Sequence, residues 1–245
     1  MPIPVPIVRR EFRQEESGRW GLVLYFDGHP DADQTDFAPV GKVCDFSFAL
    51  AVPSNSPVKN LKEFVAYAKS RPGQLNYAGG SVGSAAHLAG ELFNALGGVD
   101  ITHIPYKSGG QSIQAVIAQE VEFTFENPAV AMPLIQSGTV RALAVTSKER
   151  TRLAPEIPTV AESGLPGFEL NSWFGLLAPA GTPAAVVQKL NQVVNANLST
   201  PEMVARLKTE GATATPTSPE AFGQLIQREI KRWRPVVLNA KITAD

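Results

Sequence analysis

The glycine-rich segment Gly79–Gly83 stands between a short apolar strand pattern and a helical pattern that starts at Ser84. The first N–H groups of a helix have no partner inside the helix, and the helix dipole places partial positive charge at the same end. A glycine-rich turn that leads into a helix therefore directs several backbone donors at one point. This spacing predicts a site for a small anion such as a carboxylate.

Four residues of this turn supply the expected contacts. Gly80 and Gly83 let a ligand approach the backbone closely, and Ser81 and Ser84 add hydroxyl donors. A charge-assisted hydrogen bond contributes about 1.5–3 kcal/mol, so two or three of them could hold a carboxylate without an arginine or a lysine. The alternative is a plain glycine turn in which Ser84 serves only as the helix N-cap.

The same residues match the Gly-x-Ser-x-Gly pattern of a serine hydrolase, with Ser81 as the nucleophile. In the usual hydrolase order, an acidic residue and then a histidine follow the serine. The three histidines are His29, His87 and His103, so no histidine follows residue 103. A hydrolase therefore stays a minor alternative. A dinucleotide site is weaker still, because Ser81 stands where Gly-x-Gly-x-x-Gly needs a glycine.

Other candidate positions follow the same logic, and each has a structural alternative. His87 lies one turn into the helix, where a histidine more often packs and caps than binds. Pro105–Gly110 is a second glycine-rich turn, or simply a turn. Glu126 and Asn127 end a strand, where α/β proteins bind ligands, although Asn127 could equally cap the next helix. The rings of Ser172–Gly175 are more often core than part of a ligand site.

The composition limits the partners. The chain has 245 residues, of which 44% are hydrophobic and 18% charged, and its net charge is -1. Nucleic acids and anionic membranes attract a basic excess, so neither is expected as a partner. The single Cys44 excludes an internal disulfide and, with three histidines, argues against a zinc site. We expect no enzyme activity, no cofactor and no metal.

The N-terminal segment lacks the order of a secretory signal. Its basic residues follow a short apolar piece that prolines interrupt. No apolar run in the chain is long enough to span a bilayer. As written, the chain is therefore expected to be cytoplasmic or to have lost a leader.

Strand-like and helix-like segments alternate from about residue 40, which predicts an α/β fold with a largely parallel sheet. Helices are predicted at Leu61–Ser70, Ser84–Leu96, Gln111–Ala118 and near Ala129–Gln136. Strands are predicted at Leu75–Ala78, Ile101–Ile104, Val121–Phe125, Arg141–Thr146 and Ser172–Ala178.

The remaining segments carry other signals. Ser147–Asn171 is rich in proline and glycine and should be irregular. Thr182 and Ser218 each precede a proline, which predicts that they N-cap the last two helices. Near the N-terminus, only Gly21–Phe26 looks like a strand.

Six segments resemble, in the right order, those of the periplasmic substrate-binding proteins of tripartite tricarboxylate transporters, the TctC or Bug family. They are Asp36–Val40, Asn76–Glu91, His103–Lys107, Arg141–Ser147, Ile157–Gly164 and Ser172–Pro183. The resemblance runs from about residue 35 to the end, and the ordered set is far more specific than any one motif.

This resemblance implies a two-lobed α/β fold of the periplasmic binding protein type II kind. Two crossing strands would link residues 1–51 and 176–245, the first lobe, to residues 52–175, the second. A small mono- or dicarboxylate would bind between the lobes, and closure would present the protein, a monomer in the periplasm, to the membrane subunits of the transporter.

The binding positions that the resemblance carries over lie on the turns and strand ends already named. They are Gly80, Ser81, Gly83, Ser84, His87, Tyr106, Glu126, Asn127, Ser172 and Trp173. The family often has aspartate where Glu126 stands, and the longer side chain bears on the size and charge of the ligand.

The start of the chain departs from the family pattern. Family members open with a signal peptide and a βαβα segment whose first loop forms the opposing jaw of the site, and neither is recognisable here. We therefore expect an incomplete first lobe, with an edge or an apolar face exposed. The alternative to a binding protein is thus a truncated family member that binds nothing.

Overall fold

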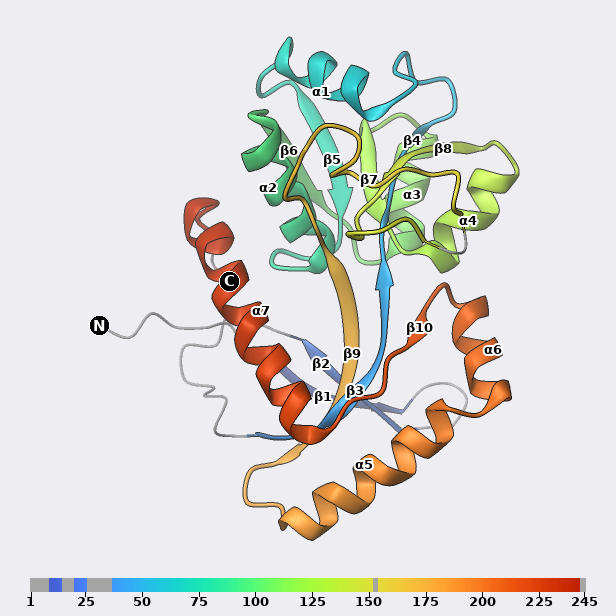
Figure 1. Cartoon of the computed structure of the whole chain (residues 1–245). Coiled ribbons are helices and arrows are strands. Elements are labelled where there is room, and N and C mark those ends of the chain that lie inside the picture. Colours follow the sequence, from blue (N-terminus) through green and yellow to red (C-terminus); the bar gives the residue numbers. More distant parts are fainter. Residues whose placement is uncertain (1–8, 15–19, 26–36, 152–153, 243–245) are drawn as a thin grey trace.

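The protein has an α/β fold, seen in a computed structural model that describes residues 9–14, 20–25, 37–151 and 154–242 (Figure 1). A five-stranded sheet has the order β6-β5-β7-β4-β8, and a three-stranded sheet has the order β10-β3-β9. Strands β1 and β2 form a separate pair. Figure 1 shows the five-stranded sheet with its helices in the upper part and the three-stranded sheet in the lower part.

The bounds of the elements follow the chain in order. The strands are β1 (Arg9–Gln14), β2 (Trp20–Tyr25), β3 (Phe37–Ser47), β4 (Ala49–Pro53), β5 (Leu75–Gly79), β6 (Ile101–Pro105), β7 (Phe123–Glu126), β8 (Val140–Val145), β9 (Asn171–Pro179) and β10 (Thr213–Ala214). The helices are α1 (Leu61–Lys69), α2 (Ala85–Gly97), α3 (Gly109–Ile117), α4 (Pro128–Gln136), α5 (Ala184–Leu198), α6 (Pro201–Thr209) and α7 (Pro219–Asn239).

The strand directions correct the expectation of a largely parallel sheet. Strand β5 is parallel to β6 and β7, but β4 is antiparallel to β7 and β8. The three-stranded sheet is antiparallel throughout. The cause is the connection, because β4 follows β3 after only Phe48 and enters the upper sheet from the lower one. It therefore runs against the strands that are each followed by a helix.

The two sheets are joined by a pair of strands. Strands β3 and β9 pair from Phe37 with Pro179 to Ser47 with Asn171, and both continue toward the upper sheet (Figure 1). The register shifts twice in β3, between Pro39 and Gly41 and again between Lys42 and Cys44. The chain thus passes between the two sheets at the β3–β4 connection and at the start of β9. The division into two lobes stays a prediction.

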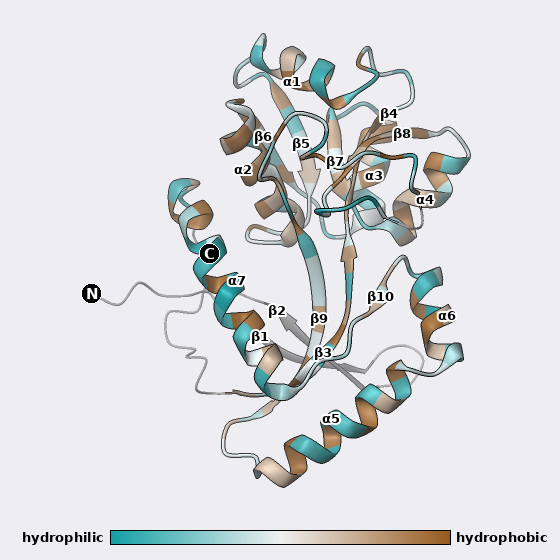
Figure 2. Ribbon diagram, in the orientation of Figure 1, coloured by the Kyte–Doolittle hydropathy of each residue, from teal (hydrophilic) through white to brown (hydrophobic). Residues whose placement is uncertain are grey.

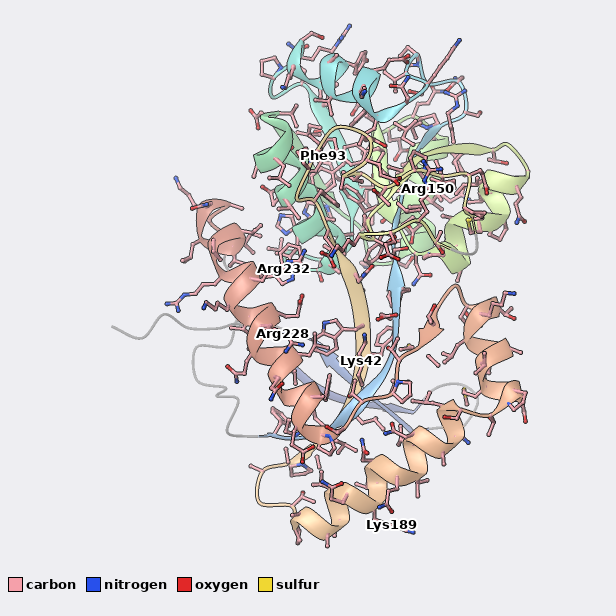
Figure 3. All side chains as sticks on the ribbon, viewed as in Figure 1. Lys42, Phe93, Arg150, Lys189, Arg228 and Arg232 are labelled. Carbon is pink, nitrogen blue, oxygen red and sulfur yellow. The ribbon has the colours of Figure 1, made fainter. Side chains whose placement is uncertain are left out.

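Aromatic rings fill the core of the upper part. Phe123 on β7 lies between the rings of Tyr77 and Phe64, at centroid distances of 5.3 and 5.0 Å. Phe93 of α2 packs on the same ring at 5.9 Å and points into the upper part (Figure 3). Figure 2 shows the hydrophobic colour concentrated on these inner strands and on the inner sides of the helices.

The long segment between β8 and β9 is irregular, as predicted, yet it supplies core residues. The N–H of Val160 donates a hydrogen bond to the carbonyl of Val145 on β8, with an N···O distance of 2.9 Å. Phe168 is buried and stacks on Phe125 with a centroid distance of 6.0 Å. This irregular segment therefore packs on the core of the upper part and contributes side chains to it.

Two helix starts test the capping predictions. The Ser218 side chain accepts a hydrogen bond from the N–H of Ala221, so this N-cap is confirmed. The Thr182 prediction is wrong, because Pro183 occupies the N-cap position of α5. The Thr182 hydroxyl instead donates to the carbonyl of Pro179 at 2.7 Å, which closes the preceding turn.

The sequence missed four strands, β1, β3, β4 and β10, and the helix α6. Strand β1 pairs with β2 along its whole length, so the expectation of only one strand near the N-terminus is wrong. That expectation ran to Phe26, which lies outside the described residues. Helix α6 and strand β10 were also not predicted, because their polar sequences carry little apolar periodicity.

The lower sheet has one covered and one exposed apolar side. Trp173 meets the Phe222 ring of α7 edge-on at 5.4 Å. Phe174 and Leu176, on the other side of β9, are 58% and 39% exposed. On α5, Val186, Leu190 and Val193 are exposed as well. Among the described residues, large apolar side chains are therefore exposed on β9 and α5, while the incomplete first lobe stays a prediction.

Candidate functional site

Three helices begin at the same edge of the upper sheet. Strands β5, β6 and β7 run in one direction, and each is followed directly by a helix: α2, α3 and α4. The N-caps are Ser84, Ser108 and Asn127, whose side chains accept the N–H groups of His87, Gln111 and Ala129. Helix N-termini carry partial positive charge, so three of them at one edge favour an anion there. In Figure 1 this edge faces the lower sheet.

The glycine turn after β5 is held partly by its own bonds. Gly83, with a φ of 80°, donates its N–H to Nδ1 of His87 at 2.9 Å. The N–H of Ser84 donates to the carbonyl of Ser81 at 2.9 Å, and the Ser84 hydroxyl accepts from the N–H of His87 at 3.3 Å. The N–H groups of Gly83 and Ser84 therefore already have acceptors within the protein.

Other amides of the same turn stay open. In the described structure, no acceptor meets the N–H groups of Ser81, Val82, Ala85 and Ala86. Ser81 and Val82 are exposed, and Ala85 and Ala86 are the first two residues of α2. Ala85 and Ala86 were missed by the sequence analysis, although the first two amides after an N-cap are the ones that a helix leaves free.

A side chain at position 80 would be packed tightly against Ser84. A Cβ atom at this position would lie 3.1 Å from the Ser84 hydroxyl oxygen and 3.2 Å from the Ser84 Cβ. Gly83, by contrast, has open space around it and needs glycine for its backbone angle. The two glycines thus shape the turn for different reasons.

Two stacked histidines lie directly under the turn. The rings of His87 and His103 are 4.1 Å apart at an angle of 12°, and His87 is only 7% exposed. Burial lowers the pKa of His87, and burial followed by the neighbouring His87 lowers the pKa of His103 to about 4. Since Nδ1 of His87 accepts the Gly83 N–H, its proton is on Nε2. His87 therefore supports the turn from within the protein.

The contact of His87 with Glu91 joins two groups whose charged forms are disfavoured by burial. Nε2 of His87 lies 3.7 Å from Oε1 of Glu91. Burial lowers the pKa of His87 and raises the pKa of Glu91, so neither group favours its charge in this place. The hydroxyl of Tyr77 donates to the same carboxyl at 3.2 Å and also reaches the His87 carbonyl.

The geometry lacks the contact that a serine hydrolase needs. A nucleophilic serine must lie within hydrogen-bond reach of its base. In the described residues, the Ser81 hydroxyl has no such bond, and the free lone pair of His87 is taken by Gly83. His103 is behind His87, with its Nε2 buried and without a partner.

The turn after β6 is tied to the end of β5. The N–H of Tyr106 donates to the Gly79 carbonyl at 2.8 Å, and the Ser112 hydroxyl lies 3.4 Å from the same oxygen. Within the structure as described, the N–H groups of Gly109 and Gly110 meet no acceptor. Ser108 caps this helix as Ser84 caps α2, a repeat that the sequence alone displays.

Glu126 ends β7 beside α3. The side chain is 4% exposed, and Oε1 accepts the N–H of Asn127 at 2.9 Å. Burial raises the pKa of Glu126 to about 7. Asn127 caps α4 through its contact with Ala129 at 2.9 Å, which is the structural role that the sequence analysis left open.

Ser172 and Trp173 lie on β9, in the other sheet. Ser172 pairs with Phe46 of β3, and Trp173 packs on Phe222 of α7. The other eight predicted positions lie on or beside the ends of β5, β6 and β7. The candidate site is therefore this strand edge, with β9 facing it from the connection between the sheets.

The α/β architecture, with two sheets joined through β3 and β9, is that of the solute-binding proteins. Residues 25–242 match the family model described as "Tripartite tricarboxylate transporter family receptor". The chain belongs to this family. None of the described helices combines the length and the apolar character needed to cross a membrane.

Curated relatives are similar over most of this chain. A UPF0065 protein in the tcbD-tcbE intergenic region of Pseudomonas sp. strain P51 is 32% identical over 92% of this chain and 68% of its own length. Protein BugT of Bordetella pertussis is 35% identical over 82% of this chain and 62% of its own length. The chain thus spans about two thirds of these relatives.

Solved structures are similar in fold as well. Rpa4515 of R. palustris with adipate has a TM-score of 0.80 and 35% identity, over 88% of this chain and 72% of that chain. MatC of Rhodopseudomonas palustris with bound malate has a TM-score of 0.76 and 33% identity, over 85% of this chain and 72% of that chain. Periplasmic binding protein BugD has a TM-score of 0.78 and 31% identity, over 87% of this chain and 73% of that chain.

Proposed function

We propose that this protein binds a small mono- or dicarboxylate at the turn between β5 and α2. The observation that carries this proposal is the set of open amides at Ser81, Val82, Ala85 and Ala86, beside the dipole of α2. Similar proteins are named with adipate and with malate, which supports a carboxylate as the ligand.

The remaining parts of the proposal follow from family membership. The protein would deliver its ligand to the membrane subunits of a tripartite tricarboxylate transporter, as a monomer in the periplasm. Residues 1–51 and 176–245 would move as one lobe against residues 52–175. The second candidate function, a family member without ligand, is favoured by the exposed side chains of Phe174 and Leu176.

A proline at the first residue of α2 tests the proposed donor amides. Ala85→Pro removes one N–H and puts the ring where the carboxylate would lie, while the helix tolerates proline at this position. Ser84 has φ -62° and ψ 160°, the conformation that a residue before proline prefers. We expect carboxylate affinity to fall by a factor of about 10 to 100, the size of one charge-assisted hydrogen bond. Calorimetric titration with adipate and malate measures it.

The matched control is Ala184→Pro at the first residue of α5. Pro183 before it has φ -56° and ψ 137°, so this helix start also accepts proline. Equal affinity in Ala85→Pro and Ala184→Pro would remove α2 from the site. If no carboxylate binds to parent protein that melts cooperatively, the proposed function fails and the second candidate stands.

A further inference from the structure

Glu126 is a buried acid with one oxygen left without a partner. The side chain is 4% exposed, Oε1 accepts the Asn127 N–H, and in the described structure Oε2 accepts no hydrogen bond. Oε2 is not one of the fully enclosed, unpartnered side-chain atoms of the described residues, so a ligand at the strand edge can reach it.

The carboxyl group lies against the first turn of α3. A Cβ atom built on Gly109 would meet Oε1 at 2.3 Å and Oε2 at 3.1 Å. Gly109 and Gly110, whose N–H groups meet no acceptor in the described structure, are the first two residues of this helix. The registers of β5 and β7 pair Ala78 with Thr124, so Glu126 ends the strand next to the glycine turn. Glu126 and the proposed carboxylate site therefore belong to one edge.

The helices and strands around Glu126 carry few charged side chains, and Lys107 before α3 and Glu210 beside Gly211 are exposed. Helices α3 and α4 and strand β4 contain no acidic or basic side chain. Strand β5 contributes Tyr77, whose pKa is raised chiefly by burial. Helix α2 contributes His87, whose pKa is lowered by burial, and Glu91, whose pKa is raised chiefly by burial. No cation lies on these elements to hold Glu126 as a carboxylate. Burial raises its pKa to about 7, against the opposing effect of the hydrogen bond from the Asn127 N–H.

We propose that Glu126 acts as a carboxylic acid in the ligand site and donates a hydrogen bond to the second carboxylate of a dicarboxylate. This inference rests on the proposed function and names its substrate class. One carboxylate would bind the amides of the β5–α2 turn, and the other would share the Glu126 proton. That proton comes from solvent when Glu126 is ionised before binding, so binding then takes up one proton per ligand. No bond other than this hydrogen bond is formed.

The test is the pH dependence of binding, measured by calorimetry. A dicarboxylate that needs protonated Glu126 should bind about 20-fold more weakly at about pH 8.5 than at about pH 6.5. Adipate and malate are the dicarboxylates, and hexanoate is the monocarboxylate. Hexanoate should show no such decrease, because its single carboxylate binds the amides. Heats in buffers of different ionisation enthalpy give the number of protons taken up.

Glu126→Gln separates the acid from the shape of the side chain. The amide keeps an oxygen for the Asn127 N–H and a permanent donor for the ligand, so dicarboxylate affinity should become independent of pH. Glu120→Gln, an exposed carboxylate on the preceding turn, should keep the decrease of the parent. A thermal melt of each variant confirms folding.

Three outcomes would overturn the inference. The first is dicarboxylate affinity that is the same at both pH values in the parent. The second is a decrease that persists in Glu126→Gln. The third is binding of hexanoate without binding of either dicarboxylate. The absence of binding by all three compounds in folded parent protein contradicts the proposed function instead.

Discussion

Lowering the pH from about 7 to about 4 is expected to remove on the order of 3 kcal/mol of stability through His103 alone. The pKa of His103 is about 4 in the folded protein, against an ordinary value of 6.5. The unfolded chain therefore binds the proton first. The stabilisation is fully present above pH 6.5 and is lost as the pH falls through that window.

The cause is first the burial of His103 and then the neighbouring His87. Its ring stacks on His87 at 4.1 Å and packs against Tyr77 at 5.1 Å. A Cβ atom on Gly79 would lie 2.6 Å from Nε2, which shows how closely the strand end covers this nitrogen. The backbone hydrogen bond to Gly80 favours a charged ring but is outweighed by burial and by His87, so protonation should open the layer below the glycine turn.

Urea unfolding over a series of pH values measures this effect. His103→Gln removes the titrating group, so its free energy of unfolding should fall less steeply between about pH 6.5 and about pH 4 than that of the parent. The comparison uses the slopes, because the variant also loses ring contacts and starts from lower stability. Identical slopes in the two proteins would contradict the prediction.

Gly90→Ala is expected to lower the free energy of unfolding by about 3 kcal/mol, at the upper end of overpacking costs. A Cβ atom at Gly90 would lie 2.0 Å from Cζ and 2.3 Å from the hydroxyl oxygen of Tyr77. Tyr77 is fully buried, and its hydroxyl donates to the His87 carbonyl and to Glu91. The ring cannot move away without breaking these bonds.

Gly97→Ala on the same helix is the matched control. Its Cβ atom would meet Val99 at 3.4 Å, an ordinary contact. Because alanine favours the helix by about 1 kcal/mol over glycine, this variant should be as stable as the parent or more stable. Denaturant unfolding of the two variants gives the difference. A Gly90→Ala protein as stable as Gly97→Ala would show that α2 shifts freely over β5.

The sequence predicted the elements around the site well because their signals are local. Helix α2 begins after Ser84 as expected, and α1 ends one residue before the predicted Ser70. The turn of Gly79–Gly83 lies at the end of a strand and before a helix, so the context of the candidate site was also predictable. The fold class and the family are confirmed by the family model and by the similar structures.

Other features depend on contacts that are distant in the sequence. The antiparallel direction of β4 follows from its direct link to β3 through Phe48, and apolar spacing carries no information on strand direction. The use of the Gly83 N–H by His87 depends on the side-chain orientation one turn into the helix. The stack of His87 on His103 needs β6 beside β5, which only the sheet order provides.

The paired strands β3 and β9 also determine how any closing motion could travel. Because these strands stay hydrogen-bonded to each other over their length, the two sheets are joined by a ribbon rather than by two separate hinges. Because the two strands are hydrogen-bonded to each other, we expect them to bend and twist together. The two register shifts in β3 interrupt the ladder and bend the strand, so we expect any bending of the ribbon to be concentrated there.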